Sequence, residues 1–331
     1  MRSAMSLTGR RVKAPAKLRT RPVVVEAPAS SANLGPGFDS LALALDLHLR
    51  VTVTPLDHGS EQMVVEGEGA DEIGLDAGNR FLIGLERGLQ ELGAEPPVMR
   101  IEMENEIPLA RGLGSSAAAS VAGLLVAEAL AGRRIGMARL HQMATDIDGH
   151  PDNVAAALLG GFVIVGRDAD GAPTAVRFDP PGALEAALFI PEAPLRTAAM
   201  RAALPRRVEH ADAAHNIGRA ALVAAALAGD RPDLLRAMSD DRLHEPYRAR
   251  HFPALPALID AARSAGALGA ALSGAGSTVL ALCAGAAMAE VVGRAMSAAA
   301  DRLGLPGRAE VVRPTGTGAR VINAARANLR A

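Results

Sequence analysis

The chain has 331 residues, 49% of them hydrophobic and 21% charged, which is typical of a globular protein long enough for two domains. Its formal net charge of -1 gives no general attraction to nucleic acid, and six Phe, one Tyr and no Trp provide no surface on which bases could stack. We expect neither a nucleic acid nor a membrane as partner, since the apolar runs are too short and too often interrupted by Gly to span a bilayer.

Residues 1–21 are rich in Arg and contain no long apolar run, so they predict a flexible basic extension rather than an export signal. The single cysteine, Cys283, lies in an apolar run and cannot form an intrachain disulfide, which favours a reducing compartment. We therefore expect a cytoplasmic protein.

A loop that contains two candidate ligand-binding residues follows the short strand predicted at residues 23–27. Residues 27–40 are rich in Pro, Gly, Asn and Asp and lead directly into an apolar segment. Asn33 and Asp39 in this loop have two interpretations. They are either turn-forming residues whose side chains bond their own backbone, or ligand-binding groups held at a fixed spacing.

Three strands and one helix are predicted before the next loop. Alternating patterns indicate strands at residues 47–55, 62–66 and 99–104. Between the second and third of these, an amphipathic pattern predicts a helix that begins after Asn79 as N-cap and ends at Gly93. The third strand leads to a glycine-rich segment.

This segment, residues 108–118, has the properties of a phosphate-binding loop. Its two glycines can adopt positive φ angles that let backbone N–H groups approach an anion, and Ser115 and Ser116 stand where an N-cap belongs. An Ala-rich helix predicted at residues 117–131 would point its unpaired amides and positive dipole end into the turn. The alternative is a tight turn that only caps a core helix. The segment also lacks the Gly-Lys-Ser/Thr ending of a Walker A motif.

A polar cluster follows the helix predicted at residues 137–147. Within eight positions the chain carries Asp146, Asp148, His150, Asp152 and Asn153. Because Mg²⁺ prefers oxygen ligands, this cluster predicts a site for Mg²⁺ and a substrate hydroxyl, and the alternative is an ordinary helix end and turn.

The second half of the chain begins after a Gly-, Pro- and Asp-rich segment, residues 166–181, which is the predicted domain boundary. Thr197 and Arg201 lie four residues apart and would share one face of a helix. A second glycine turn, residues 273–276, enters a buried strand. The other elements predicted here are strands at residues 186–190, 308–313 and 316–321 and helices at 210–227, 231–238 and 290–303.

Three motifs, in this order, resemble those of the GHMP small-molecule kinases. Residues 28–39, Pro-Ala-Ser-Ser-Ala-Asn-Leu-Gly-Pro-Gly-Phe-Asp, are similar to the first motif of the homoserine kinase family, whereas other GHMP kinases usually carry Gly-Glu-His there. Residues 108–118 resemble the second motif and residues 269–282 the third. Three more segments resemble homoserine kinase sequences: 149–155, 197–205 and 242–248.

The resemblance covers residues 22–322 and implies an α+β protein with two domains. The first, residues 22–170, would be like the second domain of ribosomal protein S5, and the second, residues 171–331, would be ferredoxin-like. With ATP and Mg²⁺, a site between the domains would phosphorylate L-homoserine to O-phospho-L-homoserine, a step towards threonine. The resemblance also implies a homodimer.

For the nucleotide, the resemblance implies that Asn79 contacts the adenine, although helix capping explains this residue equally well. The two glycine turns would hold the phosphates through Pro108, Leu109, Ala110, Arg111, Gly112, Leu113, Gly114, Ser115, Ser116, Ala117, Ala118, Ser273, Gly274 and Gly276. For the metal, it implies Ser116 together with an acidic residue, here Asp148 or Asp146.

For the amino-acid substrate, the resemblance implies that Asp39 binds the ammonium group and that Arg201 and Arg248 bind the carboxylate, with Arg250 as the alternative to Arg248. The residues implied to contact homoserine are Asn33, Asp39, His150, Asn153, Thr197, Arg201 and Arg248. Of these, Asn33, His150 and Asn153 would act at the reacting hydroxyl.

Two positions depart from the family pattern. Asp148 stands where the family has the longer Glu, and Ser277 stands where it usually has Pro. No general base is predicted, because phosphoryl transfer depends mainly on positioning and charge neutralisation. The Lys and Asp pair of the mevalonate kinase type is not expected, because Lys13 and Lys17, the only lysines, precede the first strand. The alternative functions are another GHMP kinase with a different alcohol as substrate, and a non-catalytic sensor that has kept the fold.

Overall fold

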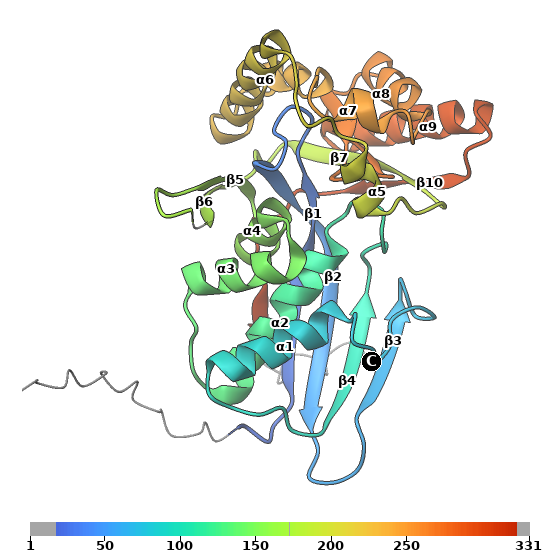
Figure 1. Ribbon diagram of the computed structural model, residues 1–331. Helices are drawn as coiled ribbons and strands as arrows, with labels where there is room; N and C mark the ends of the chain where they lie inside the picture. Colours follow the sequence, from blue (N-terminus) through green and yellow to red (C-terminus); the bar gives the residue numbers. More distant parts are fainter. Residues whose placement is uncertain (1–17, 172, 323–331) are drawn as a thin grey trace, which may run out of the picture.

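The computed structural model describes residues 18–171 and 173–322, and it shows two sheets, each with helices packed against it (Figure 1). The predicted α+β class is therefore confirmed. The basic extension predicted for residues 1–21 lies outside the described residues except at positions 18–21.

The first sheet has seven strands, in the order β11-β1-β2-β4-β3, with β5 paired to β2 and β6 paired to β5. Its strands are β1 (Val23–Ala32), β2 (Leu41–Pro55), β3 (Gln62–Gly67), β4 (Met99–Asn105), β5 (Phe162–Arg167), β6 (Pro173–Phe178) and β11 (Arg320–Ile322). Four helices cover one face of this sheet (Figure 1): α1 (Arg80–Glu91), α2 (Ser115–Ala131), α3 (Met137–Asp148) and α4 (Pro151–Leu159).

The first two strands are longer than predicted. The predicted strand at 23–27 continues to Ala32, because the pairing of β1 with β2 resumes after a register shift between Pro28 and Ala29. Such an irregularity tolerates a proline, which has no N–H to donate to the ladder. The loop predicted to begin at residue 27 therefore begins after Ala32, and the apolar segment after it belongs to β2.

The second sheet is fully antiparallel and has the strand order β10-β7-β9-β8. Counted along the chain this order is fourth, first, third and second, as in a ferredoxin-like domain. Its strands are β7 (Leu184–Pro191), β8 (Gly269–Leu272), β9 (Val279–Ala284) and β10 (Gly307–Val312). The accompanying helices are α5 (Thr197–Ala202), α6 (His210–Ala228), the 3-10 helix η1 (Pro232–Ser239), α7 (Glu245–Arg248), α8 (Leu255–Ser264) and α9 (Ala286–Arg302).

The segment predicted as a helix at residues 231–238 is a 3-10 helix rather than an α-helix. Its buried residues include Leu235 and Met238, which are three positions apart and therefore lie on the same side of a helix with three residues per turn.

The hydrophobic core continues from one sheet to the other. In β7, Ala187 and Phe189 pack in a cluster with residues of α8 and α9, whereas Leu188 and Ile190 on the opposite face belong to the same cluster as the core of the first sheet. The two sheets thus share buried apolar contacts, which fix the position of the site between them.

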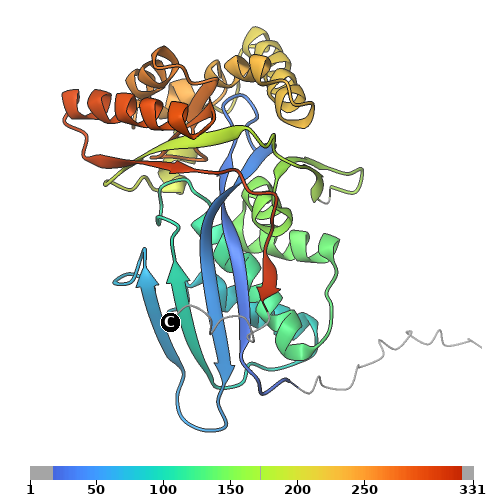
Figure 2. The same ribbon diagram turned by 180° about the vertical axis from the view of Figure 1, so that it is seen from behind.

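Sheet membership does not follow the predicted domain ranges 22–170 and 171–331. β6 pairs with β5, and β11 returns to pair with β1, so both belong to the first sheet. Figure 2 shows the end of the described chain, in red, crossing from the second sheet to lie along β1. None of the helices in the described part of the chain is long and apolar enough to cross a membrane.

Candidate active site

Two cavities have the glycine-rich segment as part of their lining. The first, about 210 Å³, is lined from both domains by residues that include Asn33, Asp39, Arg80, Asp148, His150, Asp152, Asn153, Thr197, Arg201, Arg248 and Gly274. The second, about 300 Å³, has a more apolar lining that includes Leu49, Ile73, Asn79, Phe81, Met103, Leu109 and Ala119. Both are lined by Arg80, Ala110, Ser115 and Ser116, so the glycine-rich segment joins the two cavities.

The backbone of this segment takes up the positive φ angles that its glycines predicted. Gly112 has φ 76° and Gly114 has φ 73°. The N-cap of α2 is Gly114, and the helix begins at Ser115, so the prediction that Ser115 and Ser116 are caps is wrong. Gly114 is needed at the cap because its left-handed conformation brings the chain against Ser30, leaving the two serines in the first turn of the helix. Their backbone N–H groups are among those left without intrahelical partners, as an anion site requires.

The second glycine turn, residues 273–276, packs against Gly112 of the glycine-rich segment. The Ser273 hydroxyl donates to the Gly112 carbonyl over 2.7 Å, and the Thr278 N–H donates to the Arg111 carbonyl over 3.1 Å. Of the three residues predicted here to bind nucleotide, Gly274 lines the first cavity, whereas Ser273 and Gly276 are not among the lining residues of either cavity.

The residues predicted for the nucleotide divide into three groups by position. The first cavity is lined by Pro108, Ala110, Gly112, Leu113, Gly114, Ser115, Ser116 and Ala117, and the second by Asn79 and Leu109 as well as by Ala110, Ser115 and Ser116. Ala118, the fourth residue of α2, is fully buried. The Arg111 guanidinium donates to the carbonyls of Leu109, Pro191 and Glu192, so it ties the loop to the end of β7.

Asn79 caps α1, as one of its two interpretations predicted. Its Oδ1 accepts from the N–H groups of Phe81 and Leu82, and its Nδ2 donates to the Gly74 carbonyl over 2.8 Å. The amide is thus occupied by the protein itself, although the side chain also lines the second cavity.

Of the two candidate acidic ligands, Asp148 faces the glycine-rich segment. Its carboxylate accepts a hydrogen bond from the Ser116 hydroxyl and lies 3.3 Å from His150 Nδ1. Asp146 is exposed, and its carboxylate accepts from Gln142 over 2.7 Å. The structure therefore places Asp148, and not Asp146, beside Ser116.

Ser116 and Asp148 bring two oxygen donors together at the N-terminal end of α2. Two such donors fit Mg²⁺, which usually takes one or two protein oxygens and completes its shell with water and substrate phosphate. Among the described residues no group of three or more His, Cys, Asp or Glu side chains could hold a metal ion. A metal here would therefore depend on ligands from the substrate and solvent.

Two ionisable groups near Asp148, His150 and Asp152, have raised pKa values. A hydrogen bond to Asp148 raises the pKa of His150, although partial burial opposes this effect. Burial raises the pKa of Asp152 to about 6, and the nearby charge of Asp39 adds to this rise. The Asp152 Oδ1 atom accepts from the Asn153 N–H over 2.8 Å, which opposes the rise.

Asp152 and Arg80 also line the first cavity. Asp152 was predicted only as a member of the polar cluster, and Arg80 was not predicted as a site residue. Asp152 sits in the first turn of α4 directly after Pro151, so its position in the polar cluster was a usable signal. Arg80 follows an N-cap on an amphipathic helix, where a basic residue is normally at the surface. Its Nη1 atom donates to the Ile147 carbonyl over 2.7 Å, a contact between elements that the sequence does not reveal.

The amides of Asn33 and Asn153 are held by specific partners. Asn33 Nδ2 donates to the Gly274 carbonyl over 2.8 Å, and its Oδ1 accepts from the Asp39 N–H over 3.0 Å. Asn153 Oδ1 accepts from the Ser30 hydroxyl over 2.9 Å. Asn33 thus fastens the loop that carries Asp39 to the second glycine turn.

Asp39 and Arg201 pair with each other across the domains. Arg201 Nη1 and Nη2 donate to the two Asp39 oxygens over 3.0 and 2.8 Å. The side chains are 38% and 42% exposed, so solvent screens the pair, and pairs of this kind contribute about 0 to 1 kcal/mol. Such a pair can be opened at low cost. Thr197, one turn earlier on α5, lines the same cavity.

Arg248 is a buried cation without a carboxylate partner among the described residues. Its Nη1 donates to the Gly274 carbonyl over 2.8 Å and to His244 Nδ1 over 3.1 Å, but its buried Nε has no hydrogen-bond partner within residues 18–171 and 173–322. Burial, followed by the charge of Arg201, lowers its pKa to about 10. Arg250, the alternative to Arg248, is exposed over the ring of Tyr247 and does not line the cavity.

Comparison with known proteins relates this chain to one family. The family described as GHMP kinases N terminal domain matches residues 80–161, and GHMP kinases C terminal matches residues 222–302. A homoserine kinase of Streptomyces coelicolor is 42% identical over 303 residues, covering 90% of this chain and 97% of its own length. A homoserine kinase of Deinococcus radiodurans is 45% identical over 260 residues, covering 78% of this chain and 84% of its own length. The solved structure of a homoserine kinase from Cytophaga hutchinsonii superposes with a TM-score of 0.81 at 28% identity, covering 96% of this chain and 100% of that one.

The geometry at Gly114 predicts that a single methyl group there weakens ATP binding. A Cβ atom on Gly114 would lie 2.0 Å from Ser30 Oγ, so Gly114→Ala should push the turn out of place and lower the affinity for ATP by about tenfold or more. Titration calorimetry measures this affinity.

Gly136→Ala is the matched control, because Gly136 is also an N-cap glycine with positive φ but no atom of the described part of the chain lies within 4 Å of the added Cβ. It should bind ATP as the wild type does. Equal ATP affinities of the two variants would contradict the assignment of the loop.

Proposed function

Since this chain belongs to the homoserine kinase family of the GHMP kinases, as its motifs predicted, we propose that it transfers the γ-phosphate of ATP to the hydroxyl group of L-homoserine. In this reaction the hydroxyl oxygen forms a bond to the γ-phosphorus, the bond to the bridging oxygen of ADP breaks, and the hydroxyl proton is released. The product, O-phospho-L-homoserine, is a precursor of threonine. The observation that supports this substrate most directly is the meeting of a phosphate-binding loop with Asp39, Arg201 and Arg248 in one cavity.

ATP would occupy both cavities. The apolar second cavity suits the flat adenine ring, and the turn at residues 112–114 suits the phosphates, which would extend along the N-terminal end of α2 into the first cavity. The chain would thus hold the terminal phosphate beside the amino-acid site.

Mg²⁺ would be held by the Ser116 hydroxyl and the Asp148 carboxylate. Bound there, the ion would neutralise charge on the phosphate oxygens. Since Asp148 also lies beside His150, the same carboxylate would orient the imidazole, and the hydrogen bond between them favours the protonated form of His150.

The ammonium and carboxylate groups of homoserine would each replace one partner of the ion pair between Asp39 and Arg201. Asp39 and Arg201 neutralise one another across the open cavity, and an ammonium group could replace Arg201 at Asp39 while a carboxylate replaces Asp39 at Arg201. Arg248 would add hydrogen bonds from the edge of its guanidinium that includes the unpaired Nε. Thr197 would line the same end of the site.

The hydroxyl group of homoserine would be positioned by Asn33, His150 and Asn153. None of them needs to act as a strong base, because phosphoryl transfer depends mainly on alignment and on neutralisation of charge. A cytoplasmic location and a homodimer complete the proposal, and light scattering of the purified chain tests the second of these.

A coupled assay of ADP release tests the substrate. With ATP and Mg²⁺, L-homoserine should stimulate ADP release with a specificity constant well above those of L-threonine, L-serine and mevalonate. Preferential turnover of mevalonate would identify a different GHMP kinase, and no stimulation by any of the four would refute the proposed activity.

Arg248→Met should raise the KM for homoserine by about ten- to hundredfold, because a buried charge-assisted hydrogen bond to the carboxylate is lost. The KM for ATP should stay near the wild-type value. Arg250→Met removes an exposed guanidinium two residues away and should change neither constant. If Arg248→Met instead raises only the KM for ATP, the guanidinium belongs to the phosphate site.

Asp148→Asn should lower turnover and increase the Mg²⁺ concentration needed for half-maximal rate, since an amide is a weaker ligand than a carboxylate. Asp146→Asn, the control on the same helix, should leave both quantities unchanged. A Mg²⁺ requirement raised by Asp146→Asn and not by Asp148→Asn would reverse the assignment.

A further inference from the structure

Three nitrogen-bearing side chains gather around the ring of Phe38, the residue before Asp39. The guanidinium carbon of Arg201 lies 5.6 Å from the ring centroid, and that of Arg248 lies 5.4 Å from it. The imidazole of His244 is stacked on the same ring, with centroids 5.2 Å apart and planes inclined by 30°. Both arginines that would bind the carboxylate therefore contact one aromatic side chain.

The hydrogen bonds of His244 fix its tautomer. An arginine can only donate, so His244 Nδ1 accepts from Arg248 Nη1 over 3.1 Å. The remaining nitrogen, Nε2, then carries the proton and donates to the Gly35 carbonyl over 2.8 Å. Burial lowers the pKa of His244, which keeps the ring neutral and able to accept.

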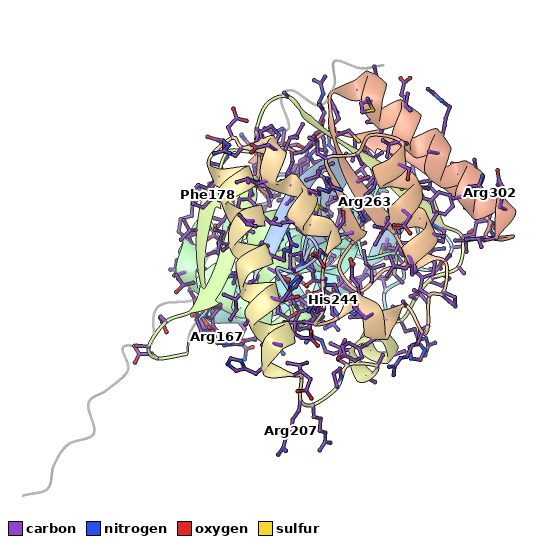
Figure 3. All side chains as sticks on the ribbon, turned by 90° about the horizontal axis from the view of Figure 1, so that it is seen from above. Arg167, Phe178, Arg207, His244, Arg263 and Arg302 are labelled. Carbon is purple, nitrogen blue, oxygen red and sulfur yellow. The ribbon has the colours of Figure 1, made fainter. Side chains whose placement is uncertain are left out.

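His244 therefore connects two parts of the proposed site. Through Gly35 it holds the loop that carries Asp39, and through Arg248 it holds one of the two guanidinium groups. The side chain is completely buried, and it lies near the middle of the molecule in the view from above (Figure 3). It cannot reach solvent, so its contacts with the protein determine its orientation.

The two guanidinium groups repel one another, and Arg201 contributes to lowering the pKa of Arg248. Each gains by lying within about 6 Å of the centre of an aromatic ring, where the electron-rich face attracts a cation. A ring that both cations contact can thus hold them closer together than they would lie in a purely aliphatic setting. A leucine in place of Phe38 would keep the apolar volume but would not provide this attraction.

We propose that Phe38 and His244 form a positioning pair that sets the two guanidinium groups, Arg201 and Arg248, at the spacing required by the substrate carboxylate. This inference rests on the proposed function. Neither residue need touch the reacting atoms. Phe38 orients both arginines through its ring, and His244 fixes Arg248 and the ring itself.

Phe38→Leu is the direct test. It should raise the KM for homoserine by about tenfold, because both arginines lose an attraction that is modest for each of them. The kcat and the KM for ATP should change by less than twofold, because Phe38 is not proposed to touch the reacting atoms. Phe38→Tyr keeps the ring and should restore a KM near the wild-type value. A Phe38→Leu variant with an unchanged homoserine KM, or a Phe38→Tyr variant as impaired as Phe38→Leu, would overturn the proposal.

Phe178→Leu is the matched control. Phe178 also belongs to an aromatic pair, with Phe162 at 6.0 Å between centroids, but it lies on β6, well away from His244 (Figure 3). The homoserine KM of the Phe178→Leu variant should equal that of the wild type. A general loss of packing would impair both leucine variants, whereas loss of positioning impairs only Phe38→Leu.

An analogue without the carboxylate separates positioning from other roles of Phe38. 3-Amino-1-propanol keeps the ammonium and hydroxyl groups of homoserine, so Phe38→Leu should use it as well as the wild type does. An equal loss with both substrates would mean that Phe38 does not act through the arginines, and would overturn the inference. A wild-type chain that fails to phosphorylate homoserine would instead refute the proposed function.

If Phe38→Leu does not fold, as judged by circular dichroism, His244→Phe carries the test. This change keeps a stacked ring but removes both the acceptor for Arg248 Nη1 and the donor to the Gly35 carbonyl. It should raise the homoserine KM several-fold and leave the KM for ATP unchanged. A wild-type homoserine KM in a folded His244→Phe variant would overturn the role assigned to the pair.

Discussion

The close packing of the two glycine turns is the constraint on which the proposed site depends. A Cβ atom on Gly112 would lie 2.1 Å from the Ser273 carbonyl oxygen, so only glycine allows the turns to approach this far. The Gly274 carbonyl then accepts hydrogen bonds from both Asn33 and Arg248. One short piece of backbone thereby supports the phosphate loop, the loop of Asp39 and the buried arginine.

This shared support explains how a site between two domains can be precise. The proposed phosphate contacts come from the first domain, and the proposed carboxylate contacts come from the second, yet the parts that carry them touch one another directly. The continuous hydrophobic core beneath them limits relative movement of the sheets. The exposed pair of Asp39 and Arg201 is by contrast weakly held, which suits groups that must change partners when a zwitterion enters.

Local patterns predicted much of this arrangement, and contacts distant in sequence account for what they missed. The N-cap at Asn79, the positive φ angles of Gly112 and Gly114 and most helices follow from short-range rules. Propensity alone did not show that β1 continues past Pro28, because pairing with β2 decides it. Propensity also did not show that Arg248 and Arg250, two residues apart, differ in burial. Arg248 is buried against Gly274, whereas Arg250 is exposed over the ring of Tyr247.

The most direct test of the proposed substrate binding is a crystal structure of the chain with L-homoserine and a non-hydrolysable ATP analogue. We expect the ammonium group within hydrogen-bonding distance of Asp39, the carboxylate between Arg201 and Arg248, and the hydroxyl group directed at the γ-phosphate next to the turn at residues 112–114. A homoserine molecule bound with its carboxylate at Ser116 and Asp148, or a nucleotide whose phosphates contact Arg201 and Arg248, would contradict the proposed binding.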